Sequence, residues 1–227
     1  MRLRPARPAD REALLAISLA TGDAGGDAAR LYRDGDLIGL IYSAPYLALE
    51  PDLAPVAQDG DGVAGFAVGT ADTPAFEARL ERDWWPPLRA AHPAHEGDPA
   101  AWTADERRIA RFHAPRLTPT AVTARRPAHL HLNLLPRAQG RGLGRRLVQT
   151  WLARLAELPA PPGEGRPEVG VGVHVGVGPA NARALRFWRA CGFEPLEDPE
   201  RAARAGVVWM CRDADEPAGG VLGRAAP

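Results

Sequence analysis

The chain of 227 residues contains no lysine, so all 28 of its basic residues are arginine. This absence excludes every mechanism in which a lysine amine acts as nucleophile or base. Cysteine is scarce too: Cys191 and Cys211 are too few for a disulfide-stapled scaffold and show no metal-binding spacing. Both lie among apolar residues, so we expect buried free thiols in a reducing compartment.

Long apolar runs are also missing. No stretch approaches the roughly 20 apolar residues of a membrane span, and the N-terminal sequence MRLRPARPADREALL lacks the apolar core of a signal peptide. The 28 basic residues balance 28 acidic ones, which leaves no electrostatic footprint for nucleic acid or an anionic membrane. We therefore expect a cytoplasmic monomer or homodimer that binds neither nucleic acid nor membrane.

The composition, 45% hydrophobic and 25% charged, is that of an ordinary globular protein. We expect one domain over residues 1–212 and a flexible tail at 213–227. The pattern predicts a strand at residues 2–4, a helix that begins near Asp10, and a hairpin over residues 53–70. Residues 74–119 indicate a helical insertion, with helices near 76–83 and 103–112 and proline-rich loops between them.

The strongest pattern begins at residue 129. Residues 129–134 (HLHLNL) alternate with the period of a strand, and a glycine-rich turn then leads into a helix with apolar residues at helical spacing. The free N–H groups and the dipole at such a helix start bind anions. The glycine spacing fits neither the P-loop nor the dinucleotide fingerprint. The turn is therefore typical of a phosphate or pyrophosphate site.

A second pattern follows about 40 residues later. Residues 159–167 indicate a loop, and residues 169–177 alternate valine with glycine or histidine and predict a strand. Residues 179–190 predict a helix with Asn181 near its start, and Gly192 stands where a C-cap glycine belongs. A last strand is expected at residues 207–211.

In this order, the two patterns resemble the GNAT superfamily of acyl-CoA-dependent acetyltransferases. Gln139-x-x-Gly142-x-Gly144 is similar to the pyrophosphate loop of that family, and residues 181–193 are similar to its later helix. A narrower resemblance, in residues 46–49, 65–73 and 129–132, is to the acetyltransferase-like C-terminal domain of O-GlcNAcase and its free-standing bacterial relatives. The human form of that domain is regarded as a pseudo-acetyltransferase, whereas the glycine loop of this chain is intact.

The resemblance implies an α/β fold: a mixed, twisted central sheet of about seven strands, flanked by helices and split at the glycine loop. It implies acetyl-CoA as acyl donor and an amine, in a small molecule or a protein, as acceptor. A backbone N–H near Leu134 would polarise the thioester carbonyl. Asn181 either binds the cofactor arm or only caps its helix. The implied cofactor-binding residues are Leu132, Asn133, Leu134, Gln139, Gly140, Arg141, Gly142, Leu143, Gly144, Arg145, Asn181 and Trp188.

Two positions depart from the family pattern. Trp188 stands where relatives often have a tyrosine that protonates the leaving thiolate, and an indole N–H is no acid near neutral pH. Gly176 stands where relatives often have a glutamate. The three tyrosines, Tyr32, Tyr42 and Tyr46, lie far from this helix in the sequence.

A base that acts through water would suffice for attack by an amine. The candidates are Asp72, His131 and His174. Each has a structural alternative, since Asp72 would also cap the helix that follows it and the histidines would also pack within their strands. His129, His131 and Asn133 share one strand face, but no cysteine or carboxylate completes a metal set, so we expect no metal.

Trp84, Trp85, Trp102 and His113 either line an acceptor pocket or form the core of the insertion. Taken together, the resemblance implies an acetyl-CoA-dependent N-acetyltransferase. The alternative is a catalytically weak or inactive module of the pseudo-acetyltransferase type, which binds acyl-CoA or another protein.

Overall fold

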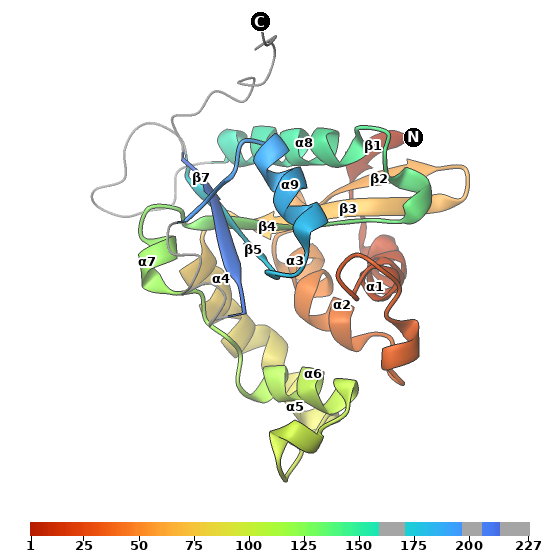
Figure 1. Cartoon of the computed structure of the whole chain (residues 1–227), viewed down its shortest axis with the longest axis vertical. Coiled ribbons are helices and arrows are strands. Elements are labelled where there is room, and N and C mark those ends of the chain that lie inside the picture. The colour runs from red at the N-terminus through yellow and green to blue at the C-terminus, as the bar shows by residue number, and fades with distance from the viewer. Residues whose placement is uncertain (159–170, 197–205, 214–227) are drawn as a thin grey trace, which may run out of the picture.

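The computed structural model describes residues 1–158, 171–196 and 206–213. In this part of the chain one seven-stranded sheet has the strand order β1-β2-β3-β4-β5-β7-β6 (Figure 1). Neighbouring strands are antiparallel except β4 and β5, which are parallel. The strands are β1 (Arg2–Pro5), β2 (Pro55–Asp59), β3 (Gly62–Thr70), β4 (Ala128–Leu134), β5 (Val173–Val177), β6 (Glu194–Pro195) and β7 (Val208–Arg212).

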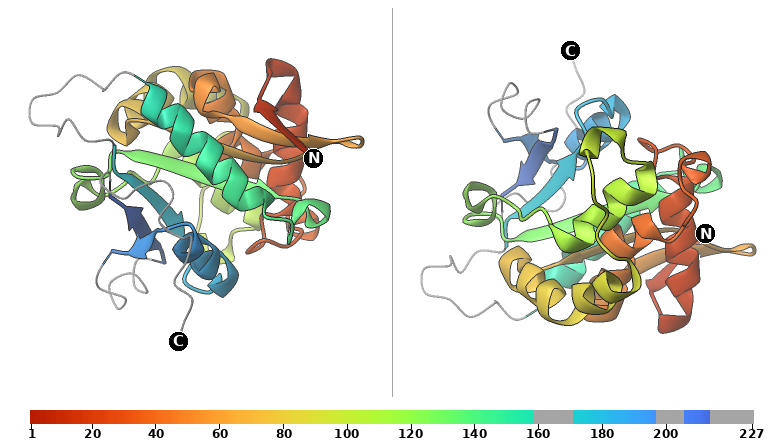
Figure 2. Two further views of the ribbon diagram at one scale, coloured as in Figure 1. Left: turned by 90° about the horizontal axis from the view of Figure 1, so that it is seen from above. Right: turned by 90° about the horizontal axis from the view of Figure 1, so that it is seen from below.

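Helices cover both faces of the sheet, as the sequence predicted. In Figure 2, α8 crosses the sheet in the view from above, and α6 lies in front of it in the view from below. The helices are α1 (Arg11–Ala20), α2 (Leu37–Tyr42), α3 (Ala44–Leu49), α4 (Thr73–Arg79), α5 (Trp85–Ala91), α6 (Ala104–His113), α7 (Thr120–Thr123), α8 (Leu143–Glu157) and α9 (Ala182–Ala190). Short 3-10 turns are η1 (Pro8–Asp10), η2 (Ala29–Leu31), η3 (Pro51–Leu53), η5 (Pro99–Ala101) and η6 (Pro136–Ala138).

Two large hydrophobic clusters lie on opposite faces of the sheet. One joins α1, α2 and α3 to α4, α5 and α6, with Phe66, Phe76 and Phe112 fully buried. The other joins α8 and α9 to the central strands through Leu130, Trp151 and other buried residues. Alternation along β2 and β3 produces the division: Val56, Phe66 and Val68 enter the first cluster, whereas Ala57 and Ala67 enter the second, since successive side chains of a strand point to opposite faces.

The insertion is more helical than the sequence predicted. The helix expected at residues 76–83 begins earlier, at α4, and continues through a π-helical turn η4 (Leu80–Trp84) into α5. The expectation of proline loops here was wrong at Pro86 and Pro87, because both prolines lie in the first turn of α5, where a missing N–H is not needed. The helix expected at residues 103–112 is confirmed as α6.

Other differences from the expected elements are small. The patterns did not predict α2, α3 or the two-residue strand β6, and β7 lies one residue later than expected. The hairpin and the two strand–helix units are confirmed, although β5 begins only at Val173, so that residues 171 and 172 are not strand, and α9 begins three residues later than expected. The loop expected at residues 159–167, the first two residues of the strand expected at 169–177, and the tail after residue 213 lie outside the described residues.

None of the helices in residues 1–158, 171–196 and 206–213 combines the length and the apolar character needed to cross a membrane.

Candidate active site

Strands β4 and β5 separate shortly after they begin. They pair only at Ala128 with Val173 and at His129 with His174. The Ala128 N–H bonds Gly172 O towards β5, whereas the Leu135 N–H bonds Ala64 O near the start of β3. Because N–H directions alternate along a strand, the N–H groups of Leu132 and Leu134 face the opening. The expected split is therefore present, with unpaired peptide groups along its β4 edge.

The glycine turn lies at the wide end of this opening. Gly140 and Gly142 have φ angles of 72° and 71°, in the left-handed region that favours glycine. Gly142 is the N-cap of α8, and the first backbone bond of the helix runs from the Arg146 N–H to Gly142 O. The N–H groups of Leu143, Gly144 and Arg145 precede that bond and have no intrahelical acceptor. These N–H groups and the positive end of the helix dipole suit the N-terminus of α8 to bind an anion.

Side chains fix the turn against its neighbours. Gln139 donates from Nε2 to Leu134 O over 2.7 Å and accepts from Arg183 of α9 over 2.5 Å. A Cβ on Gly144 would lie 2.9 Å from the Phe187 ring, so glycine allows α8 to approach α9 closely. In this structure Gln139 thus joins the end of β4, the turn and α9. Arg141 and Arg145 are exposed beside the turn, and Leu143 is buried beneath it.

Asn181 and Trp188 belong to α9. Asn181 caps the helix, since its side-chain oxygen accepts from the Ala184 N–H over 3.0 Å. Trp188 is 6% exposed and packs edge-on between Phe187 and Phe193, with ring centroids 5.1 and 5.0 Å away. The capping role that the sequence offered as an alternative for Asn181 is therefore realised, and Trp188 has a packing role.

The histidine face of β4 carries a buried hydrogen-bond chain. The Tyr46 hydroxyl lies 2.6 Å from His129 Nε2 and 3.0 Å from His131 Nε2. His129 Nδ1 lies 2.7 Å from the Thr73 hydroxyl. That hydroxyl donates to Pro127 O over 2.5 Å. Helix α3, helix α4 and strand β4 thus meet at two imidazoles near the narrow end of the split.

The donors and acceptors of this hydrogen-bond chain can be assigned in one consistent direction. The carbonyl of Pro127 only accepts, so the Thr73 hydroxyl uses its proton there and accepts from His129 Nδ1–H. His129 Nε2 is then the acceptor of the Tyr46 proton, and the Tyr46 oxygen accepts from His131 Nε2–H. His131 Nδ1, which has no hydrogen bond to the described part of the chain, therefore carries a free lone pair. This assignment follows from the hydrogen-bond partners.

Burial keeps all three central imidazoles neutral. It lowers the pKa of His131 to about 4, with a further contribution from His174. It also lowers the pKa of His174 to about 4 and that of His129 well below its usual value. Burial raises the pKa of the Tyr46 phenol well above its usual value. A neutral His131 and a neutral Tyr46 are the forms that the chain of hydrogen bonds requires.

The other two base candidates have different surroundings. Asp72 lies beyond β3 and caps α4, with its carboxylate accepting from the Ala75 N–H over 3.1 Å. His174 is 1% exposed and donates from Nδ1 to Arg126 O over 2.7 Å. Its ring lies 5.4 Å from that of His129. The structure brings His131 and His174 together near the narrow end of the split.

Sequence reasoning missed the tyrosines. Tyr42 and Tyr46 are distant from β4 in the sequence, yet their rings lie 5.6 and 5.2 Å from that of His131. No periodicity connects α2 and α3 to β4. The one available signal was the resemblance of residues 46–49 to the O-GlcNAcase-like domain, which did not identify Tyr46 as a site residue.

Three of the four aromatic candidates of the insertion have packing roles. Trp85 is buried and stacked on Phe112, Trp84 donates to Leu40 O, and His113 bonds His92 O. Trp102 contacts His95 edge-on. Among the described residues, no group of three histidine, cysteine or carboxylate side chains is arranged to hold a metal ion.

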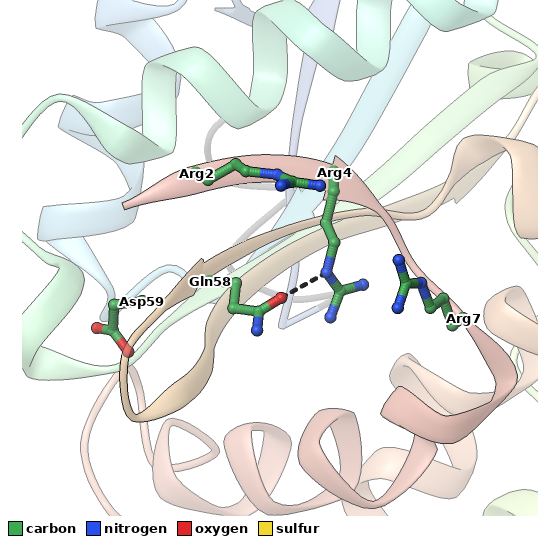
Figure 3. Close-up of a pocket in the computed structure, with 5 residues that line it drawn as sticks. All are labelled: Arg2, Arg4, Arg7, Gln58 and Asp59. Carbon is green, nitrogen blue, oxygen red and sulfur yellow. Dashed lines mark hydrogen bonds between the residues drawn. The ribbon is translucent and has the colours of Figure 1, made fainter.

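A pocket of about 410 Å³ lies elsewhere, on the β1 edge of the sheet (Figure 3). It is lined by Arg2, Arg4, Arg7, Gln58 and Asp59. Arg4 pairs with Asp10 and bonds Gln58, and Asp59 pairs with Arg137. Because β2 and β3 separate this pocket from β4, it is not part of the split.

Comparison with solved structures finds a relative with clear sequence similarity and more distant proteins of similar fold. No family model matches the chain. The crystal structure of SsHAT is 37% identical, over 95% of this chain and 98% of that chain, with a TM-score of 0.79. An N-acetyltransferase from Staphylococcus aureus Mu50 is 16% identical, over 93% and 98% of the chains, with a TM-score of 0.55. A putative acetyltransferase from Salmonella typhimurium, yncA, was solved with acetyl-CoA and is 17% identical, over 100% and 97%, with a TM-score of 0.50.

Proposed function

Because this chain belongs to the GNAT superfamily of acetyltransferases, we propose that it transfers an acetyl group from acetyl-CoA to the nitrogen of an amine. Within the superfamily it is similar to the free-standing bacterial relatives of the acetyltransferase-like domain of O-GlcNAcase. The observation that supports the proposal most is the split between β4 and β5, with an anion-binding turn at its wide end and His131 near its narrow end.

The residues around the split fit acetyl-CoA. The N–H groups from Leu143 to Arg145 would hold the pyrophosphate, with Arg141 beside them. The β4 edge at Leu132 and Leu134 would pair with the amides of the pantetheine arm, as an added strand would. The donor supplies an acetyl group activated as a thioester. The Leu134 N–H would donate to the thioester oxygen, the role of an oxyanion hole.

His131 is the base in this proposal. The Tyr46 oxygen accepts from His131 Nε2–H, which leaves the lone pair on Nδ1, and the residue is half-buried. It accepts, through one water, the proton that the amine nitrogen loses as its bond to the acetyl carbon forms. The amine is bound in its neutral form beside the thioester, so its lone pair is already positioned for attack when His131 takes the proton. The thiolate leaves without a tyrosine acid, since Trp188 occupies that position and a thiol is a good leaving group.

The test measures two properties separately. Binding of acetyl-CoA is measured by calorimetry, and thiol release from acetyl-CoA is measured with peptides, aminoglycosides, polyamines, amino sugars and amino acids. Binding with amine-dependent thiol release supports the proposal. Binding without release for every amine favours the alternative, an inactive acyl-CoA-binding module. A folded protein that does not bind acetyl-CoA contradicts both.

A further inference from the structure

A half-buried arginine lies between two tyrosines on the face of the sheet that α1 to α6 cover. Arg108 of α6 donates from Nε to the Tyr32 hydroxyl over 2.8 Å and from Nη1 to the Tyr42 hydroxyl over 3.1 Å. Its guanidinium carbon lies 5.9 and 5.5 Å from the centres of the two rings. These contacts fix the guanidinium in place, and Nη2 makes no hydrogen bond within the described part of the chain.

Within the described part of the chain, no carboxylate forms an ion pair with this guanidinium, whose hydrogen bonds go to the two tyrosine hydroxyls. Elsewhere half-buried arginines pair with carboxylates, as Arg4 does with Asp10 and Arg79 with Glu50. Among the described residues neither Arg108 nor its neighbour Arg111 forms an ion pair. Asp105, one helical turn before Arg108, uses its oxygens on the backbone N–H groups of Arg33 and Asp34.

A second guanidinium adds to the charge. Arg111 is partly buried one turn after Arg108. Burial lowers the pKa of Arg111, and the positive charges of Arg116 and Arg108 lower it further. Like charges gathered without a carboxylate destabilise the free protein, and an anion placed between them would relieve that repulsion.

Tyr42 connects this cluster to the proposed base. Its ring centroid lies 5.5 Å from the Arg108 guanidinium carbon and 5.6 Å from the centroid of the His131 ring. One tyrosine ring thus separates the uncompensated charge from the imidazole. A small molecule a few bonds long could reach both.

We infer that Arg108, with Tyr32, Tyr42 and Arg111, binds an anionic group of the acceptor, so that the substrate is a small amine carrying a carboxylate or a phosphate near its reacting nitrogen. The inference rests on the proposed function. The free N–H groups of Arg108 form a planar fork that suits either anion. The tyrosine hydroxyls accept from Arg108, which leaves their own protons available to the anion.

The experiment compares matched amines that differ in one charge. The carboxylate arm uses β-alanine against β-alaninamide, and the phosphate arm uses O-phosphoethanolamine against ethanolamine. Each kcat/KM is corrected for the fraction of unprotonated amine. We expect the anionic member of at least one pair to be favoured about tenfold or more, the usual size of a charge-assisted contact. The arm that shows the preference identifies the anion.

Variants test whether Arg108 and Arg111 cause the preference for the anionic amine. In Arg108→Gln and in Arg111→Gln the ratio within the favoured pair should fall towards one, while the affinity for acetyl-CoA is kept. Arg107→Gln is the matched control on the same helix, because Arg107 is exposed and, within the described residues, its side chain bonds only Ala100 O. A preference for the neutral amines, or a ratio that Arg108→Gln and Arg111→Gln leave unchanged, overturns the inference.

Binding separates this inference from the proposed function. If no amine is acetylated, the proposed function fails, and titration of propionate or inorganic phosphate into the acetyl-CoA complex decides the anion site alone. Binding that weakens about tenfold or more in Arg108→Gln but not in Arg107→Gln supports the site. Absence of binding to the unmodified protein overturns it.

Discussion

The two faces of β4 differ in what they present. On one face Leu130, Leu132 and Leu134 pack against the cluster of α8 and α9. On the other, His129 and His131 join the Tyr46 chain, and Asn133 donates to the Thr21 hydroxyl over 2.6 Å. One strand thus contributes apolar packing to the donor side and polar side chains to the acceptor side.

The proposed donor site therefore depends on backbone groups, whereas the proposed acceptor site depends on side chains. The proposed donor site would consist mainly of peptide groups: the β4 edge, two left-handed glycines and the start of α8. The proposed acceptor site would consist of side chains from α2, α3, α4 and α6. Donor binding should hence respond to changes in backbone conformation, and acceptor choice and proton transfer should respond to side-chain changes.

The largest effect is expected on the acceptor side, at His131. His131→Gln removes the base and should lower kcat by a factor in the ~10²–10⁴ range. Affinity for acetyl-CoA should stay within about threefold, since the peptide edge is kept. Asp72→Asn and His174→Asn are measured alongside, with thiol release as readout. A greater loss of kcat in Asp72→Asn, in which asparagine still caps α4, would move the role of base to Asp72.

The donor side should respond most to Gly142→Asp. Aspartate places a side chain and a negative charge where the phosphates would lie, and a like-charge contact of several kcal/mol should weaken acetyl-CoA binding about hundredfold or more. Gly142→Asn is the matched control, because asparagine tolerates a positive φ and adds no charge. If the aspartate variant shows a cooperative thermal unfolding transition, and so is folded, but binds acetyl-CoA normally, the pyrophosphate does not lie on this turn.

A smaller effect is expected at Tyr46, which acts through His131. Tyr46→Phe removes the acceptor of His131 Nε2–H, so the proton is free to move to Nδ1 and kcat should fall about tenfold, with KM for acetyl-CoA unchanged. Stability should fall by ~1–3 kcal/mol, because His129 Nε2 loses its buried partner. Imidazole nitrogen shifts report the tautomer directly. If the variant keeps both the tautomer of His131 and a normal kcat, the donor and acceptor assignment of these hydrogen bonds is wrong.

The smallest effect is expected at Trp188, on the donor side. Trp188→Phe should weaken acetyl-CoA binding less than tenfold, as for a packing contact, and leave the pH dependence of kcat unchanged. Trp188→Tyr should raise kcat, because it restores an acid at this position. The rate is measured against pH for all three forms with one acceptor. A lost alkaline limb in the phenylalanine variant would assign Trp188 a part in proton transfer.

For a physical reason, the sequence alone predicted the two strand–helix units beside the split better than the cluster of side chains around His131. Residues 129–146 and 173–193 are continuous strand–turn–helix units, so glycine spacing and periodicity state their geometry directly. On the proposed acceptor side, Tyr42, Tyr46 and Thr73 reach the histidines of β4 from three helices, and Arg108 of α6 bonds Tyr42. Such contacts depend on tertiary packing, which no local pattern encodes. The helical course through Pro86 and Pro87 was missed because proline is tolerated at a helix start, which local composition does not distinguish from a loop.

The packed imidazoles also limit the pH range in which the protein stays folded. His131 and His174 have folded pKa values of about 4, below the ~6.5 of an unfolded histidine. Between these values the unfolded chain binds more protons, so stability rises with pH and is lost as the pH falls from about 6.5 towards 4. Each such histidine contributes a slope of about 1.4 kcal/mol per pH unit in that window. The cluster that keeps a neutral base at the split therefore makes the fold sensitive to mild acid, before ordinary carboxylates begin to titrate.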